Sequence, residues 1–255
     1  MTFDVPSAAY ARFMGRYSGP LALQLADLVG VTAGQRALDV GCGAGALTSV
    51  LVERLGAAHV CAVDPSESFV AALPELLPGV EVRRGAAERL PYPDRAFDRT
   101  LAQLVVHFMT DPVAGLAEMA RVTRPGGIVA ASVWDHAGAE GPLATFWQAA
   151  RDLDPATTDE SNLPGTAEGH LAELFTAAGM TEPRSTRLTV RVAHPSFAEW
   201  WEPFTLGVGP AGAHVAALDD DARAALRDRC RDMLPAGAFT IEAVAWTAWW
   251  TRPAG

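Results

Sequence analysis

The sequence predicts a doubly wound α/β fold, in which a mostly parallel, seven-stranded sheet carries helices on both faces. Short apolar runs alternate with amphipathic segments through the first half of the chain. Parallel strands need such crossover connections, usually helices. A glycine-rich segment, residues 41–45, follows the first apolar run. Glycines at a strand-to-helix turn are typical of ligand-binding α/β sheets.

The first half is divided into strands and helices by apolar runs that end at Gly, Pro or Asp. The expected strands are residues 36–40, 59–63, 80–84, 97–102 and 128–133. The expected helices are residues 20–30, 46–55, 66–77 and 112–122. Pro20 suits the first turn of its helix, and Gly30 suits its C-cap.

The second half is less regular. Helices are expected near 143–153 and over 170–178, and strands over 186–192 and 239–251. An insertion, residues 196–235, lies between these strands and combines a Trp- and Phe-rich start with a charged helix.

Composition narrows the class of partner. The 255-residue chain has a net charge of −10, and all 20 of its basic residues are arginine. The largest arginine group, within 223–231, is interleaved with aspartates, which is typical of a solvated helix face. Because nucleic-acid binding needs a basic surface, no nucleic-acid partner is expected.

No apolar run is long enough to span a membrane, and the first residues do not resemble a signal peptide. We therefore expect a cytoplasmic protein.

The three cysteines are Cys42, Cys61 and Cys230. They form neither a CxxC motif nor a Cys/His ligand spacing. We therefore expect reduced thiols and no bound metal.

The glycine segment is ambiguous when considered alone. Gly41, Gly43 and Ala46 also fit the loose dinucleotide-binding spacing. Asp64, at the end of the second expected strand, suits a ribose diol in either kind of site. Adenosine is the common element, and the rest of the ligand stays open.

Asp39 favours one alternative. It lies two residues before Gly41, where a negative charge would repel a pyrophosphate. A ligand that carries an ammonium group and a sulfonium would be attracted instead. The other interpretation of Asp39 is a side chain that only fixes the loop.

Four segments together resemble class I S-adenosylmethionine-dependent methyltransferases, in the type 11 branch that includes ubiquinone and menaquinone biosynthesis enzymes. The resemblance covers about residues 8–134. The segments are Ala37–Gly45 (ALDVGCGAG), Ala62–Ser66 (AVDPS), Gly85–Asp98 (GAAERLPYPDRAFD) and Glu118–Gly127 (EMARVTRPGG). It implies a Rossmann-like methyltransferase fold with S-adenosylmethionine as cofactor and S-adenosylhomocysteine as product.

The resemblance also implies site residues. Asp39 and the backbone of Gly41 would hold the methionine ammonium group, and Cys42 and Gly43 are further expected cofactor contacts. Other cofactor contacts would come from Asp64, Pro65, Ser66, Ala86, Ala87, Glu88, Ala102 and Gln103. Relatives often have Asp at the position of Ala86, and Glu88 could take over its contact with the adenine amine.

The N-terminal segment resembles a lid that folds over the cofactor in this branch. Arg16 is the candidate partner of the cofactor carboxylate, since a guanidinium binds a carboxylate through two parallel hydrogen bonds, and Tyr10 is a second candidate. The alternative is an amphipathic docking helix.

We expect one domain over 1–255, composed of this lid (1–30), a cofactor-binding core (31–134), substrate-side insertions (135–181 and 196–238) and the last strands (182–195 and 239–252).

Candidate acceptor-side residues follow the fourth strand and occupy the insertions. His107 could act as a general base, because histidine titrates near neutral pH, or could be a packing residue. Trp134, Trp200, Trp201 and Phe204 could line an apolar substrate pocket or the core. Trp249 and Trp250 must face opposite sides of one strand, so at most one of them can join a pocket.

The sequence thus predicts methyl transfer to an O, N or activated C atom of a small, aromatic or apolar metabolite, with no membrane partner. Two alternatives stay open. The first is a protein that keeps the fold and the cofactor but performs a non-methylating reaction such as cyclisation, or only binds a ligand. The second is a nicotinamide-dependent oxidoreductase. The acceptor and the oligomeric state are not readable from the sequence.

Overall fold

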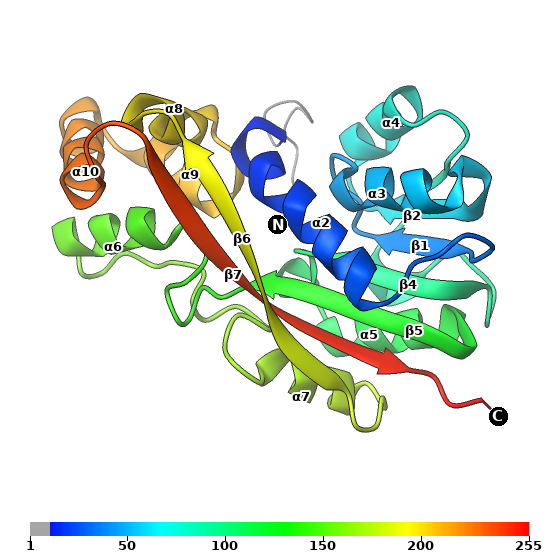
Figure 1. The fold of residues 1–255 in the computed structure, drawn as a ribbon. Coiled ribbons are helices and arrows are strands. Elements are labelled where there is room, and N and C mark those ends of the chain that lie inside the picture. Colours follow the sequence, from blue (N-terminus) through cyan, green and yellow to red (C-terminus); the bar gives the residue numbers. More distant parts are fainter. Residues whose placement is uncertain (1–10, 255) are drawn as a thin grey trace.

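The computed structural model describes residues 11–254, and a single sheet runs through this part of the chain (Figure 1). Its seven strands have the order β3-β2-β1-β4-β5-β7-β6. They are β1 Ala37–Val40, β2 Val60–Asp64, β3 Glu81–Arg84, β4 Phe97–Gln103, β5 Thr123–Trp134, β6 Arg184–His194 and β7 Phe239–Thr251. Strands β1 to β5 pair in parallel, and β7 runs antiparallel to β5 and β6. The predicted fold class is confirmed.

Helices occupy both faces of this sheet. They are α2 Arg16–Leu28, α3 Ala46–Leu55, α4 Glu67–Leu76, α5 Pro112–Val122, α6 Ala144–Leu153, α7 His170–Ala177, α8 Phe197–Trp201, α9 Gly209–Ala217 and α10 Asp220–Met233. Shorter turns are η1 Ala11–Gly15, η2 Ala57–His59, η3 Ala87–Arg89, η4 Val106–Phe108 and η5 Glu202–Leu206.

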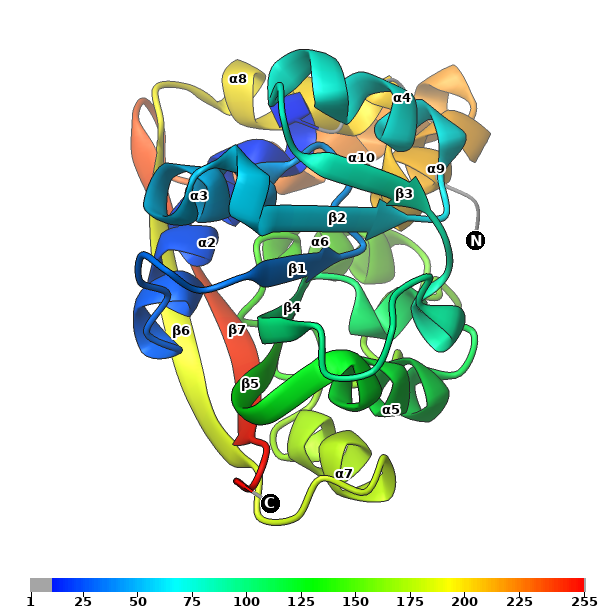
Figure 2. The ribbon, with the colours of Figure 1, turned by 90° about the vertical axis from the view of Figure 1, so that its right-hand side faces the viewer.

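The two faces of the sheet have separate cores. Leu25 of α2, Leu51 of α3 and Leu73 of α4 pack with β1 and β2 in one of them. Residues of α5 and α7 pack against the other face, and Figure 2 shows α3 and α5 on opposite sides of the strands. Trp249 joins the first core and Trp250 the second, as alternation along a strand requires.

A third cluster lies beyond the carboxyl ends of the parallel strands. It joins the start of the described chain to α6, α8, α9, α10 and the near ends of β6 and β7. Phe204 is its centre, because its ring stacks on Phe146 at 4.6 Å and meets Phe13 edge-on at 5.3 Å. The expected insertions therefore fold together with the N-terminal segment.

Two element boundaries differ from the prediction by four residues or more. Helix α2 begins at Arg16 and contains Pro20, because it continues from the helical turn η1 and does not start at the proline. Strand β5 begins at Thr123, not at residue 128. It passes through Gly126 and Gly127 at an irregularity in its pairing with β4, where these residues bond the backbone of Arg252.

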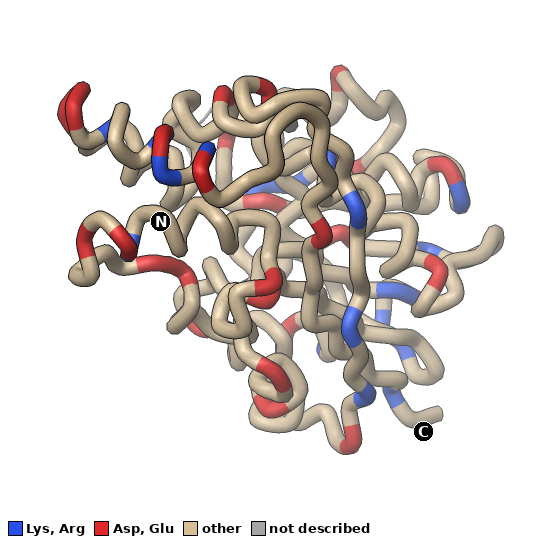
Figure 3. Tube along the Cα trace, turned by 60° about the vertical axis from the view of Figure 1, so that its left-hand side comes forward, with Lys and Arg blue, Asp and Glu red and all other residues tan. Residues whose placement is uncertain are grey.

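Charged residues of both signs are interspersed along the trace (Figure 3). On α10, Arg223 and Arg231 each pair with an aspartate three residues earlier, and Arg229 pairs with Asp152 of α6. The arginine group within 223–231 is thus largely neutralised by its neighbours. Among the described residues, no helix combines the length and the apolar character needed to cross a membrane.

Candidate functional site

A cavity of about 740 Å³ lies at the carboxyl ends of β1, β2 and β4. The strand order reverses here, because β2 and β3 lie on one side of β1 and β4 and β5 lie on the other. Ligands of open α/β sheets bind at such a switch point, and the volume falls within the range of roughly 300–1,000 Å³ found for small-molecule sites.

The glycine loop forms the floor of this cavity. Gly41, Gly43 and Gly45 have φ angles of +72°, +49° and +86°, a region in which side chains are strained. A Cβ atom on Gly41 would lie 2.3 Å from Val105 Cγ2, whereas one on Gly43 would meet nothing within 4 Å. Gly41 is therefore required for packing, and Gly43 leaves space for a ligand.

Asp39, the last residue but one of β1, presents a carboxyl group to the cavity although it is only 1% exposed. Thr48 Oγ1 of α3 donates a hydrogen bond of 2.6 Å to Asp39 Oδ2. Burial is the main cause that raises the pKa of Asp39 to about 7; the Thr48 hydrogen bond opposes this rise, and the nearby Asp64 adds to it. A carboxylate held this way favours a cationic partner.

Asp64 ends β2 and lines the same cavity. Its Oδ2 accepts from the backbone N–H of Gly43 at 2.9 Å, and its Oδ1 accepts from the N–H of Ser66 at 2.8 Å. Burial raises the pKa of Asp64, while these two bonds oppose the rise. Asp64 therefore ties the glycine loop to the next strand as well as facing the ligand space.

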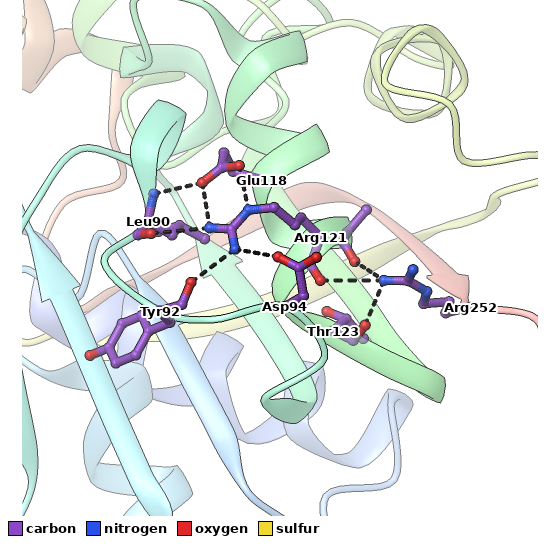
Figure 4. A network of polar contacts seen from close by, with 8 residues as sticks. Leu90, Tyr92, Asp94, Glu118, Arg121, Thr123 and Arg252 are labelled. Carbon is purple, nitrogen blue, oxygen red and sulfur yellow. Dashed lines mark hydrogen bonds and ion pairs between the residues drawn. The ribbon is translucent and has the colours of Figure 1, made fainter.

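The loop at η3 supplies a further wall through Ala86, Ala87 and Glu88. Figure 4 shows what holds it. Glu118 of α5 accepts from the N–H of Leu90 at 2.9 Å, and Arg121 donates to the Leu90 carbonyl at 3.1 Å. Glu88 Oε1 accepts from the N–H groups of Thr110 and Asp111. Glu88 is thus engaged in fixing the loop after η4.

The end of η1 and the helix α2 close the cavity with residues that the sequence analysis did not single out. Gly15, Ser18, Gly19 and Leu23 line it, and Gln103 of β4 donates to the Ser18 carbonyl at 2.9 Å. Their spacing of three or four residues places them on one helical face. That spacing is the signal that could have identified this wall.

Arg16 does not line the cavity. Its guanidinium pairs with Glu199 and lies 3.1 Å from Nδ1 of His194. Tyr17 OH is 2.8 Å from Nε2 of the same imidazole. The structure therefore places Arg16 in the contact between α2 and the insertion, because Glu199 and His194 offer partners on the other side of the helix. Tyr10 lies outside the described residues.

Of the other expected cofactor residues, all but one line the cavity. The lining ones are Asp39, Gly41, Cys42, Gly43, Asp64, Pro65, Ser66, Ala86, Ala87, Glu88 and Gln103. Ala102 is fully buried and does not line it, since its side chain packs in the core shared with α5. The backbone alternation of β4 accounts for this, because Gln103 takes the next position along the strand.

The expected acceptor-side residues lie elsewhere. Trp200 and Phe204 border a small crevice beside Arg16, and Trp201 is buried in the third cluster. His107 and Trp134 line a separate cavity of about 30 Å³. These side chains pack among the insertions and do not line the large cavity in this structure.

Comparison with known proteins finds similarity over the part of the chain that forms this cavity. Residues 38–131 match the model of a methyltransferase domain. An uncharacterized methyltransferase of Mycobacterium tuberculosis is 38% identical over 127 residues, which is 50% of this chain and 50% of that protein. A demethylmenaquinone methyltransferase of Renibacterium salmoninarum is 31% identical over 153 residues, or 59% of this chain and 63% of that protein. Residues 38–131 therefore resemble a methyltransferase domain, in the part of the chain where the four motifs predict one.

The chain spans about half to two thirds of the length of these curated relatives. Solved structures extend the likeness of fold over nearly the whole chain. The cyclase SpnF matches with a TM-score of 0.54 and 22% identity, over 93% of this chain and 81% of that one. The Rossmann-like methyltransferase fold therefore covers the insertions as well as the core.

Proposed function

We propose that this protein transfers a methyl group from S-adenosylmethionine to a small-molecule acceptor. The observation that carries the proposal is a pair of buried carboxyl groups, Asp39 and Asp64, at the ends of adjacent strands and facing one cavity. The family of residues 38–131 supports it.

Two features indicate that the cavity fits this cofactor. Asp39 would attract the ammonium group through charge, and Asp64 would accept hydrogen bonds from the ribose hydroxyls. The open space above Gly43 lets a ligand approach the backbone. A pyrophosphate would meet two carboxyl groups there, which disfavours a dinucleotide.

The cofactor would supply a methyl group on a sulfonium, activated for in-line displacement. The acceptor's electron pair forms the bond to the methyl carbon, and the electron pair of the broken C–S bond stays on sulfur. The chain would contribute by orienting the reactants and excluding water, and orientation can account for about 7–11 kcal/mol of the barrier in favourable cases. Helix α2 and the loop after η4 close over the cavity and would serve that role.

The acceptor is proposed as a small aromatic or apolar metabolite with an O, N or activated C nucleophile. The named relatives include an enzyme whose name indicates a menaquinone precursor, and the large cavity is lined mainly by apolar and small residues. Neither a nucleic-acid nor a membrane partner is part of the proposal.

Calorimetry with S-adenosylmethionine and S-adenosylhomocysteine tests cofactor binding. Mass spectrometry of a panel of phenols, amines and enolisable carbonyl compounds then tests for products heavier by one methylene unit. Absence of cofactor binding would overturn the proposal, and tighter binding of NAD would replace it with an oxidoreductase. Cofactor binding with turnover to products of unchanged mass would favour the cyclase type of reaction.

A further inference from the structure

Three side chains that can bind metals converge beside the large cavity. Among the described residues, His107, His136 and Glu160 each offer a ligand atom, and these atoms lie within 4.8 Å of one another. The two imidazole ring centroids are 6.1 Å apart. The residues come from three separate segments of the chain, so the fold alone brings them together.

The fold presents the two histidines from the carboxyl ends of the neighbouring strands β4 and β5. His107 lies on η4, directly after β4, and His136 follows β5 by two residues. Asp135 shapes the turn at His136, because its Oδ1 accepts from the N–H of Gly138 at 2.7 Å. Glu160 lies in the segment between α6 and α7, and its Oε2 accepts from Trp147 Nε1 at 3.0 Å. Each ligand is thus held by a different element.

One ring nitrogen of each histidine lacks a hydrogen-bond partner among the described residues. Nδ1 of His107 and Nε2 of His136 are buried and have no hydrogen-bond partner within residues 11–254. His107 is 5% exposed and Glu160 is 4% exposed. A buried polar atom without a partner costs about 1–3 kcal/mol, so a structural role alone leaves this cost unexplained. A bound cation would supply the missing partner for both imidazoles.

The local space has the size of an ion and not of a metabolite. These three residues line a cavity of about 30 Å³, and one water needs about 10–15 Å³ by the same kind of measure. Ligands of a zinc ion lie about 2.0–2.2 Å from it, so the three side chains must close by about 1 Å around an ion.

We propose that His107, His136 and Glu160 bind one divalent transition-metal ion, with zinc as the representative ion. Two histidines and one glutamate are a known zinc ligand set, and three protein ligands leave a position open for water or substrate. The proposal departs from the sequence-based expectation of no metal, which stays a prediction.

The position of the ion would link it to the acceptor. Leu104 and Phe108 line both the small cavity and the large one, so the two cavities are neighbours that share these side chains. An acceptor oxygen could take the open coordination position, which favours hydroxyl or enolisable carbonyl acceptors. This last step rests on the proposed methyl transfer, whereas metal binding does not.

Metal binding can be measured without any methyl acceptor. The purified chain is treated with a chelator, and Co²⁺ is titrated into it while visible absorption is recorded. We expect one Co²⁺ per chain with ligand-field bands, displaced by Zn²⁺. His107→Ala, His136→Ala and Glu160→Gln should each weaken Co²⁺ binding by about tenfold or more. His59→Ala is the matched control, because His59 is an exposed histidine on η2, and it should bind like the wild type.

Calorimetry with S-adenosylhomocysteine on the same variants separates the two proposals. A variant that no longer binds Co²⁺ but binds S-adenosylhomocysteine like the wild type supports the metal site. A wild type that does not bind S-adenosylhomocysteine would overturn only the proposed function. X-ray absorption of the zinc-loaded wild type needs no variant, and it should show nitrogen and oxygen ligands including imidazole. A wild type that takes up no Co²⁺ or Zn²⁺, or a spectrum dominated by sulfur, would overturn the metal site.

Discussion

The hydroxyl group of Thr48 donates a hydrogen bond of 2.6 Å to the carboxyl group of Asp39. This bond joins the first turn of α3 to the end of β1 across the glycine loop. It stabilises the charged form of Asp39, yet burial outweighs it and the pKa of Asp39 is raised to about 7. The protein therefore maintains, at the cavity, a carboxyl group that destabilises the fold when it is charged and unliganded.

Asp39→Asn tests this balance between stability and binding. The pKa of Asp39 is raised from 3.8 to about 7 in the folded state. The contribution of Asp39 to the free energy of unfolding is therefore fully present below pH 3.8, and it is lost as the pH rises towards 7. Each pKa unit is worth about 1.4 kcal/mol. Because the amide also loses hydration, we expect Asn to raise the free energy of unfolding of the apoprotein by about 1–3 kcal/mol at pH 8. Urea denaturation measures this change.

The same variant should bind S-adenosylmethionine about tenfold to a hundredfold more weakly in calorimetry, since it loses a charge-assisted hydrogen bond. Asp64→Asn provides the contrast. Both carboxylate oxygens of Asp64 accept from backbone N–H groups, and an amide can replace only one of them. Asp64→Asn should therefore lower both stability and affinity. Equal effects of the two substitutions on stability would contradict this account.

Cofactor binding should depend on pH through Asp39. The free protein has a pKa of about 7 at this carboxyl group, and a bound ammonium group would lower that pKa. Binding must then release a proton below neutral pH, so affinity should be constant at high pH and fall about tenfold between about pH 8 and about pH 6. Calorimetry in buffers with different ionisation heats measures the released proton.

Asp39→Asn is the control for this dependence, and its affinity should be nearly constant over the same pH range. A wild type whose affinity increases as the pH falls would show that another group controls binding.

Two glycines in the same loop should respond differently to alanine. Gly41→Ala introduces a Cβ 2.3 Å from Val105 at a positive φ, and we expect a loss of about 2–4 kcal/mol in unfolding free energy. Gly43→Ala meets no neighbour, so we expect a loss of only about 1 kcal/mol. It should instead weaken cofactor binding by filling ligand space. Thermal unfolding and calorimetry on both variants test the contrast.

Val105→Ala combined with Gly41→Ala is the matching control. It removes the colliding methyl groups and should recover part of the lost stability. If Gly41→Ala were as stable as the wild type, the close approach of the loop to Val105 would be wrong.

Arg16→Met separates two roles for Arg16. The guanidinium pairs with Glu199 and His194, so its removal should lower stability by about 0.5–1 kcal/mol and change cofactor affinity by less than about threefold. Chemical denaturation and calorimetry measure the two effects. A tenfold loss of affinity would indicate that Arg16 binds the cofactor carboxylate, as the sequence predicts.

The core of the fold and most of the cavity were predictable from the sequence because both follow from local patterns. Apolar runs bounded by glycine and proline define β1 to β4, and Asp39, Gly41 and Asp64 follow from their place at strand ends. The extension of β5 through Gly126 and Gly127 was not predictable, since it depends on pairing with Arg252 far along the chain.

The remaining site residues depend on tertiary contacts. Arg16 has the chemistry of a carboxylate ligand, but its partner Glu199 comes from an insertion whose docking the sequence does not reveal. His107 was identified as a candidate base, yet its meeting with His136 and Glu160 joins three distant segments. No local spacing indicates such a cluster.

The order of the strands in the sheet has a consequence for biosynthesis. Strand β6 reaches the sheet only through β7, which is made about fifty residues later. During translation, the core of β1 to β5 can form first, while β6 can pair with the sheet only after β7 has been made. A nascent chain that is interrupted before this point exposes the edge of β5, which makes it vulnerable to aggregation.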